Sequence, residues 1–252
     1  MEFLSIDIEA TGLDPVEASL LQVGIVHHKD FEQSLNDMIK ISIFCNQPIY
    51  GSIEGAVVNA HTFQRILQLN NLCKMVVKNG VMSTSVNVCG SNQRQRLQCN
   101  YNTTTDVFNV HCDKNCGNVI SVLDITEHEF EFLRPNESIY LIPSWNRSQD
   151  IIQTRFKKQT YTVAGKNYGM FDSRFIAHNK IWPEGWHIRH RSIDPTALFI
   201  LRSDTVPPNL QICKERAGIE DTVVHHEAIE DALDVIKVFR KGMELTQWLN
   251  EK

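Results

Sequence analysis

The chain has 252 residues, of which 42% are hydrophobic, and a formal net charge of −5. This length and apolar content are sufficient for one large domain or for one domain with a substantial insertion. The negative charge argues against a protein that coats nucleic acid through a broadly basic surface. No stretch of the sequence approaches the roughly 20 apolar residues that a membrane span requires.

The beginning of the chain and the cysteines indicate a cellular location. A charged leader followed by an apolar segment is absent, because Asp7 already lies in the first predicted strand. We therefore expect a cytoplasmic protein without a membrane partner. The seven cysteines are an odd number, and without a secretory signal they favour reduced thiols or a metal over a disulfide framework.

The first 70 residues predict the start of a sheet followed by a helix. Residues 3–8 form a short apolar run, typical of a strand buried on both faces, and the loop after it contains Pro15. Residues 20–26 and 41–44 predict two more strands, which would complete an antiparallel meander. Residues 54–69 have the apolar spacing of a helix.

The composition changes after this helix. Residues 74–150 are rich in Val, Thr, Asn and Ser, with short alternating stretches at 85–88 and 129–133. We interpret this segment as a β-rich insertion within a single domain that spans residues 1–252. The insertion would either cover part of a substrate groove or dock a partner.

Four cysteines of the insertion raise the question of a structural zinc ion. Cys112 and Cys116 are separated by three residues, which fits one half of a zinc site. Cys89 and Cys99 are too far apart in sequence to supply the other half in the usual way. We therefore favour free thiols over zinc at these four positions.

After the insertion the sequence predicts a strand that leads into a helix. The strand covers residues 161–164 and the helix residues 168–178. Asp172 lies on this helix, and Phe171 and Phe175 at i,i+4 are available for packing.

The last 60 residues contain three further structural signals. Residues 192–195 mark the end of a strand, and residues 209–217 predict a helix that ends at Gly218. The final helix begins near Glu227 and carries Asp231.

Four acidic side chains occur in sequence contexts that suggest a shared site: Asp7, Glu9, Asp172 and Asp231. Carboxylates brought together repel one another, so they coexist as anions only if cations neutralise them. Mg²⁺ and Mn²⁺ prefer carboxylate oxygen, and two such ions beside a histidine are suited to hydrolysing phosphodiesters. Taken singly, Asp172 or Asp231 is better explained as part of a solvated helix face than as a metal ligand.

The order and context of these residues resemble the DEDDh family of 3′–5′ exonucleases, which includes replicase proofreading subunits, ribonuclease T and oligoribonucleases. The resemblance rests on Asp-x-Glu-x-Thr-Gly-Leu from Asp7 to Leu13, directly after an apolar run, and on His-x-Ala-x-x-Asp-Ala from His226. It covers about residues 1–65 and 160–245. It implies an α/β, ribonuclease-H-like fold, with a mixed five-stranded sheet flanked by helices and interrupted here by the β-rich insertion.

The resemblance also implies roles for the acidic residues and for one histidine. Asp7 would bridge two Mg²⁺ or Mn²⁺ ions, Glu9 and Asp231 would complete the site that activates water, and Asp172 would hold the second ion. His226, five residues before Asp231, would act as the general base, because an imidazole can accept a proton near neutral pH.

The register of the third motif distinguishes His226 from its neighbour. His225 is one residue out of register and is interpreted as an exposed neighbour. The other branch of the superfamily has a tyrosine at the position of Glu227, so the histidine branch is favoured.

The loop after the first carboxylates would meet the terminal nucleotide. In the family its backbone approaches the substrate, which Gly12 permits, and Leu13 would wedge against the last base. The alternative is a plain turn with Leu13 in the core. The complete set of expected substrate contacts is Ala10, Thr11, Gly12, Leu13, Asn59, His61, Asn167 and Phe175.

Several basic residues flank the second motif, which comprises residues 165–172 and ends at Asp172, and could contact phosphates. Charge clusters are usually solvated faces, so none receives a role here. These residues are Arg155, Lys157, Lys158, Lys166, Arg189 and Arg191.

The sequence therefore predicts a metal-dependent 3′–5′ exonuclease that releases 5′-mononucleotides from single-stranded DNA or RNA ends. Two alternatives remain open. One is an RNA-specific trimming or oligoribonuclease-type enzyme. The other is a proofreading subunit that works mainly by docking onto a polymerase; a homodimer is also compatible with the sequence.

Overall fold

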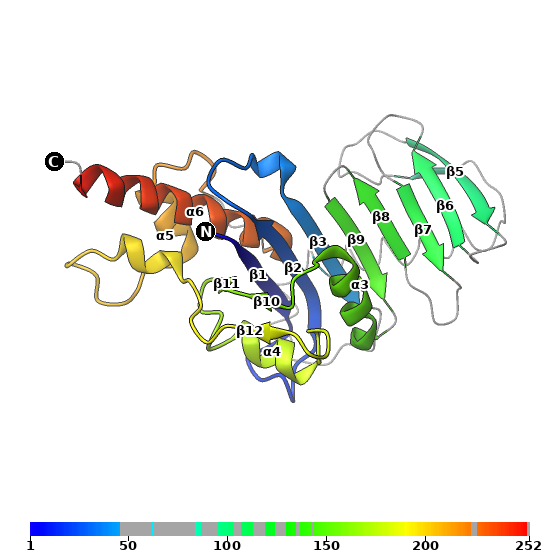
Figure 1. Ribbon diagram of the computed structural model, residues 1–252, viewed down its shortest axis with the longest axis horizontal. Coiled ribbons are helices and arrows are strands. Elements are labelled where there is room, and N and C mark those ends of the chain that lie inside the picture. The colour runs from blue at the N-terminus through cyan, green and yellow to red at the C-terminus, as the bar shows by residue number, and fades with distance from the viewer. Residues whose placement is uncertain are drawn as a thin grey trace.

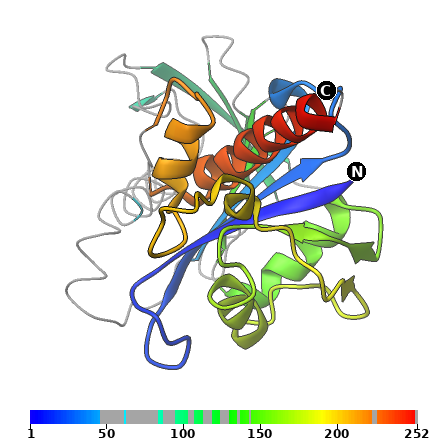
Figure 2. The same ribbon diagram turned by 90° about the vertical axis from the view of Figure 1, so that its left-hand side faces the viewer.

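The computed structural model describes residues 1–45, 62, 84–86, 95–102, 107–112, 119–123, 130–134, 137–142, 144–222 and 226–250. The chain has an α/β fold in which a mixed β-sheet carries helices on both faces (Figures 1 and 2). The strands are β1 Phe3–Ala10, β2 Leu20–His28, β3 Ile39–Cys45, β4 Thr84–Val86, β5 Gln95–Asn102, β6 Val107–Cys112, β7 Val119–Leu123, β8 Phe130–Arg134, β9 Glu137–Ile142, β10 Thr160–Tyr161, β11 Val163–Ala164 and β12 His187–Ile188.

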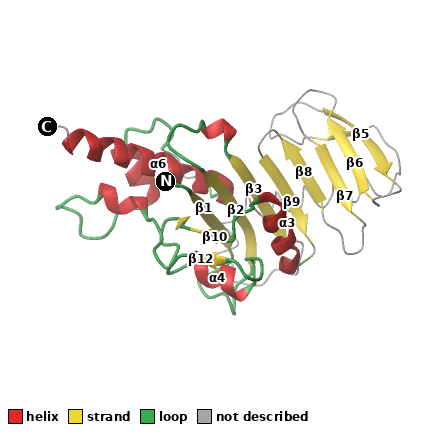
Figure 3. Cartoon of the chain, in the orientation of Figure 1, coloured by secondary structure: helices red, strands yellow, loops and turns green. Residues whose placement is uncertain are grey.

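The main sheet has the strand order β11-β1-β2-β3-β9-β8-β7-β6-β5-β4. Strands β1, β2 and β3 form an antiparallel meander, β11 pairs with β1 in parallel, and β9 pairs with β3 in parallel. These five strands are the helix-flanked part of the sheet. From β9 to β4 the remaining strands continue the same sheet as an antiparallel ladder, which Figure 3 shows as one row of strands.

Helices cover the two faces of the central strands. Within the described ranges, the helical elements are η1 Leu35–Asp37, η2 Trp145–Arg147, α3 Ser148–Arg155, α4 Asp172–His178, η3 Pro195–Phe199, α5 Leu210–Arg216 and α6 Ala228–Asn250. Buried side chains of α3 and α4 pack in one apolar core with Leu4, Ile6 and Ile8 of β1. Those of α5 and α6 pack in a second core with Phe3. Figure 2 shows α6 lying along the sheet opposite α4.

The central strands form where the sequence predicted them. All nine residues of β2 are buried, as expected for a strand with helices on both faces. Helix α5 begins after Asn209, whose side chain accepts a hydrogen bond from the N–H of Ile212, and Gly218 after its end has a φ of +67°. These features confirm the predicted meander, the helix over 209–217 and a last helix that starts near Glu227.

Two local expectations need correction. The helix expected over 168–178 begins only at Asp172, because Asn167 to Phe171 form turns in which Met170 and Phe171 donate to the carbonyl of Asn167. The strand expected over 161–164 is divided between β10 and β11. The helix expected over 54–69 lies outside the described residues except for Thr62, which is helical and buried.

The segment interpreted as an insertion contributes β-strands to the main sheet. Described residues between 84 and 142 form β4 to β9, and the buried residues Ile139 to Ile142 of β9 lie directly beside β3. Cys99 and Cys112 lie on the adjacent strands β5 and β6, whereas Cys89 and Cys116 lie outside the described residues. The zinc question therefore stays a prediction. None of the described helices is long and apolar enough to cross a membrane.

Candidate metal centre

Strand β1 places two carboxylates on one face of the sheet. Side chains alternate along a strand, so Ser5, Asp7 and Glu9 face the same way. The hydroxyl of Ser5 donates to the carbonyl of Ala232 at 2.7 Å, which identifies this face as the one covered by α6. Glu9 is buried, whereas Asp7 retains part of its exposed surface.

Helix α6 can approach this face closely because β2 has a glycine opposite Asp7. Gly24 pairs with Asp7, and a Cβ at Gly24 would lie 2.4 Å from the carbonyl carbon and oxygen of Ala228. Atoms that close cannot coexist, so only glycine allows the first turn of α6 to rest directly on the sheet. Sequence reasoning missed this role, because a glycine in an apolar strand indicates a close approach without identifying the partner.

A glutamine two residues before this glycine, Gln22, joins the same helix end to two strands. The side-chain amide of Gln22 donates to the hydroxyl of Ser42 on β3 at 2.7 Å. Its carbonyl oxygen accepts the N–H of Ala228 at 3.2 Å, so one of the four free N–H groups at the start of α6 is satisfied. Gln22 is also the β2 partner of Glu9, and it therefore fixes α6 relative to that carboxylate.

The approach of α6 brings together residues that are more than 200 positions apart in sequence. Glu9, His226 and Asp231 each present one ligand atom, and these atoms all lie within 4.8 Å of one another. Asp231 is buried in the first turn of α6, and His226 is exposed just before it, with a φ of 51°. The left-handed backbone at His226 turns the chain into the helix.

Asp172, from the second motif, lies close enough to Asp7 and Glu9 for its charge to affect both carboxylates. Gly165 lies against β1 so closely that a Cβ would be 2.7 Å from the carbonyl oxygen of Ile6, and the chain then turns into α4. Asp172 is the first residue of α4, and its side chain is 2% exposed. Strand β11 ends opposite Ser5, so the N–H of Ile8 further along β1 is available to donate to the Asp172 carboxylate.

The four carboxylates influence one another strongly. Burial, and then the charges of Asp231, Asp172 and Glu227, raise the pKa of Glu9 to about 8. Burial also raises the pKa of Asp172 to about 7, although N–H groups of Asp172 and Ile8 favour its anion. Burial and the neighbouring acids raise the pKa of Asp7 well above its ordinary value, and Lys166 opposes this shift.

The raised pKa values of the carboxylates and the types of donor atom both indicate whether the site suits a metal ion. Without a cation the cluster would have to bind protons at neutral pH, because several buried carboxylates cannot all be anionic at short range. A cluster of carboxylate oxygens with one imidazole and no thiolate is a donor set for hard or borderline divalent cations. Glu9, His226 and Asp231 therefore could hold a metal ion, with Asp7 and Asp172 as further acidic neighbours.

The predicted nucleotide loop lies at the end of β1. Ala10 and Thr11 are buried, and the N–H of Thr11 donates to Ser19 while its hydroxyl accepts the N–H of Ser19 at 2.8 Å. Gly12 is half-buried, and Leu13 is 79% exposed. The alternative that places Leu13 in the core is therefore wrong.

The remaining predicted contacts have different positions. Asn167 is exposed, with a φ of 56°, and its N–H donates to Asp194 at 3.1 Å. Phe175 is fully buried in the α4-side core and packs against Phe171, with 5.2 Å between ring centroids. Its expected substrate contact is corrected, because a side chain without exposed surface cannot reach a ligand.

Three other residues of the prediction cannot be placed. Asn59, His61 and His225 lie outside the described residues, so the distinction between the two histidines still rests on the sequence register alone. No protein-family model matches the chain, and no curated protein is significantly similar to it.

Proposed function

We propose that the protein is a metal-dependent 3′–5′ exonuclease that hydrolyses phosphodiesters at single-stranded DNA or RNA ends and releases 5′-mononucleotides. The observation that carries this proposal is the convergence of Glu9, His226 and Asp231 within 4.8 Å, from motifs at opposite ends of the chain. Asp172 lies close enough to Asp7 for its charge to raise the pKa of Asp7. The same five residues, in the same order, carry the resemblance to the DEDDh exonucleases.

The fold is compatible with this proposal. The antiparallel meander β1 to β3, with β11 added in parallel beside β1, agrees with the ribonuclease-H-like sheet that the resemblance implies. A parallel bridge between Ala164 and Ile193 extends the sheet by one more position beyond β11. The DEDDh motifs would then lie at one end of the central strand, where helices from both faces meet.

The residues of the centre have separable chemical tasks. Asp7, Glu9, Asp172 and Asp231 would hold two Mg²⁺ or Mn²⁺ ions, whose contribution is to neutralise the phosphate and to make water more acidic. In this proposal the four carboxylates hold the metals and His226, exposed beside Glu9 and Asp231, is not a ligand. A ring nitrogen, Nδ1 or Nε2, would accept the proton of the attacking water and release it to solvent.

The loop residues would orient the end of the strand. The Thr11–Ser19 hydrogen bonds hold the loop in place, and the exposed side chain of Leu13 is available to pack against the terminal base. An apolar contact of this kind is tolerant of base identity, as a sequence-independent exonuclease requires.

The test is cleavage of end-labelled single strands of DNA and RNA with Mg²⁺, Mn²⁺ or EDTA. A 5′ label should appear in progressively shorter strands and a 3′ label in mononucleotides, and Asp7→Asn should abolish both. Asp37→Asn, at an exposed carboxylate of η1, is the matched control and should cleave like the wild type. Cleavage by Asp7→Asn, or by the wild type in excess EDTA, would refute the proposal.

A further inference from the structure

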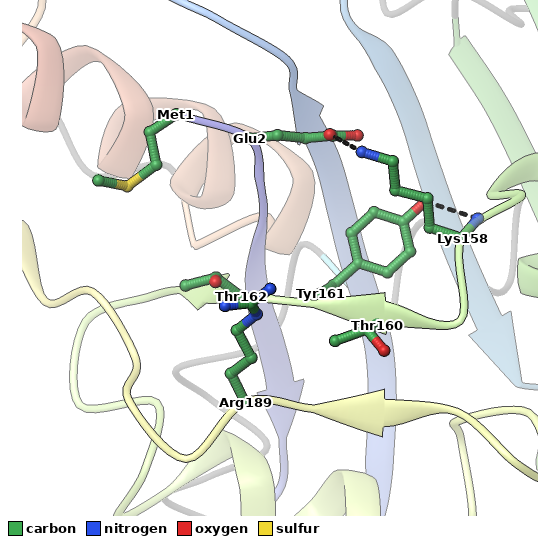
Figure 4. Close-up of a pocket in the computed structure, with 7 residues that line it drawn as sticks. All are labelled: Met1, Glu2, Lys158, Thr160, Tyr161, Thr162 and Arg189. Atoms are coloured by element: carbon green, nitrogen blue, oxygen red, sulfur yellow. Dashed lines mark hydrogen bonds and ion pairs between the residues drawn. The ribbon is translucent and has the colours of Figure 1, made fainter.

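A pocket of about 260 Å³ lies beside the N-terminal end of β1, at the other end of this strand from Glu9. Figure 4 shows that its lining includes the charged side chains of Glu2, Lys158 and Arg189, together with residues 160–162 from the neighbouring chain segment. Residues 160–162 are Thr, Tyr and Thr, so the wall is rich in hydroxyl groups as well as in cations.

Among the described residues, one cation of this pocket has no acidic partner. Glu2 already forms an ion pair with Lys158 and contacts His27 at 2.9 Å. In the part of the chain that the structure describes, the guanidinium of Arg189 makes no ion pair and no side-chain hydrogen bond. An arginine with five free N–H donors beside threonine hydroxyls is suited to an anion with several oxygens, such as a phosphate.

A continuous piece of backbone connects this pocket to the second motif. The N–H of Arg189 donates to the carbonyl of Tyr161 at 2.9 Å, and the N–H of Ile193 donates to that of Val163 at 2.8 Å. The four residue steps from Arg189 to Ile193 therefore lie opposite only two steps, from Tyr161 to Val163, so residues 190–192 form a bulge. All three are exposed, and the middle one, Arg191, has no ion pair within the described ranges.

The same piece of backbone ends beside the carboxylates. The carbonyl of Ile193 accepts the N–H of Gly165 at 3.0 Å, and the next residue, Lys166, lies close enough to lower the pKa of Asp7 against its acidic neighbours. Asp194 is the acid along this route, and its oxygens already accept bonds from Asn167 and Thr196. We name Lys166, Arg191 and Arg189, with the pocket, the cationic track.

We propose that the cationic track binds the phosphates of a single-stranded nucleic acid upstream of the end that enters the metal centre. The inference rests on the proposed function for its direction, because the carboxylates mark where the strand ends. β1 spans about 23 Å from Phe3 to Ala10, so the track would contact several consecutive nucleotides. Backbone contacts of this kind hold a strand without reading its bases.

The experiment compares the double variant Arg189→Gln/Arg191→Gln with a control that loses the same charge, Arg147→Gln/Arg202→Gln, at two exposed arginines away from the track. Binding of labelled single strands of two to about twelve nucleotides is measured in EDTA, where no metal-dependent cleavage occurs, at several salt concentrations. The track variant should bind the longest strand about tenfold more weakly, with a salt slope reduced by about 1.4, as two lost phosphate contacts predict. The control should match the wild type.

Turnover provides a second readout. In Mn²⁺, the ratio of kcat/KM for the longest strand to that for a dinucleotide should fall in the track variant and stay constant in the control. Equal strand binding by the two double variants would overturn the inference. The inference would also be overturned if the pocket bound inorganic phosphate or a nucleoside monophosphate through Arg189 while the affinity for single strands did not depend on strand length.

The design separates this inference from the proposed function. If the wild type cleaves no strand, the proposed function fails, yet the binding measurements still decide whether Arg189 and Arg191 contact a strand. If it cleaves strands and both double variants behave alike, the exonuclease stands and the track does not.

Discussion

Replacing Gly24 by alanine would separate helix α6 from the sheet at the metal centre. The new Cβ would meet the Ala228 carbonyl at 2.4 Å, about 1 Å inside ordinary van der Waals contact. Either the first turn of α6 or strand β2 must move by a similar amount. Asp231 lies in that turn, and Glu9 pairs with Gln22, two residues before Gly24 on β2, so the distance between the two ligand atoms would change.

Two magnitudes follow from this displacement. Overpacking of a well-packed contact costs about 1–3 kcal/mol of stability, and a misplacement of about 1 Å in a catalytic site costs on the order of 100-fold in rate. We therefore expect Gly24→Ala to remain folded, with a lower Tm, and to lose cleavage activity and most of the stabilisation that Mn²⁺ gives the wild type.

Thermal unfolding with and without Mn²⁺, alongside cleavage of a labelled strand, measures both effects. Gly169→Ala is the matched control, because a Cβ at this exposed glycine would meet no atom within 4 Å. If Gly24→Ala melted and cleaved like Gly169→Ala, the close approach of α6 would not be what assembles the site.

Three further predictions concern single groups of the centre and of α6. Burial raises the pKa of Glu9 from 4.5 to about 8, so between these pH values the metal-free native state keeps a proton that the unfolded chain loses. The free energy of unfolding should therefore fall as pH rises from about 4.5 to 8, by up to about 1.4 kcal/mol per pH unit. Urea unfolding in EDTA should show this slope. Glu9→Gln should reduce it, because Asp7 and Asp172 contribute the remainder, and saturating Mn²⁺ should flatten it. Stability that rises with pH and depends on Glu9 would contradict the assignment. His226→Ala should reduce the cleavage rate by about 100-fold or more, whereas His225→Ala should stay near the wild type, and the reverse order would place the third motif one residue away. Asp234→Leu should cost about 3–5 kcal/mol of stability, because it removes a buried partner of the fully buried Lys214. Lys214→Met should cost less stability, because Lys237 remains 2.6 Å from Asp234. Equal losses of stability for the two variants in urea unfolding would argue against this buried pair.

The features that the sequence predicted well depend on local patterns. Apolar runs located β1, β2 and β3, and a cap with a following glycine located α5, because strand burial and helix ends are properties of neighbouring residues. The alternation of Asp7 and Glu9 on one face follows in the same way. The convergence of these residues with His226 and Asp231 was expected from family resemblance rather than from any local pattern.

The features that the sequence did not predict depend on contacts between distant segments. The role of Gly24 is visible only once α6 lies on β2, and Phe175 could be assigned to the core only after α4 had a buried side. The late start of α4 follows from the turns after Asn167, whose left-handed backbone no simple periodicity reports. Helix α3 has a weak apolar pattern over eight residues, which is too short for a reliable period.

The parallel pairing of β3 and β9 limits how the protein can be shortened. Parallel neighbours start at the same edge of a sheet, so the chain that leaves β3 at Cys45 must return to the opposite end before it enters β9 beside Lys40. That return covers about 17–20 Å, the length of the strand, and no tight turn can make it. Cutting residues 74–150 and joining the ends would remove β9, whose side chains complete the core. A minimal version of the protein must therefore keep β9 and can lose only the antiparallel strands β4 to β8, provided that at least about six residues remain between β3 and β9 to span the return.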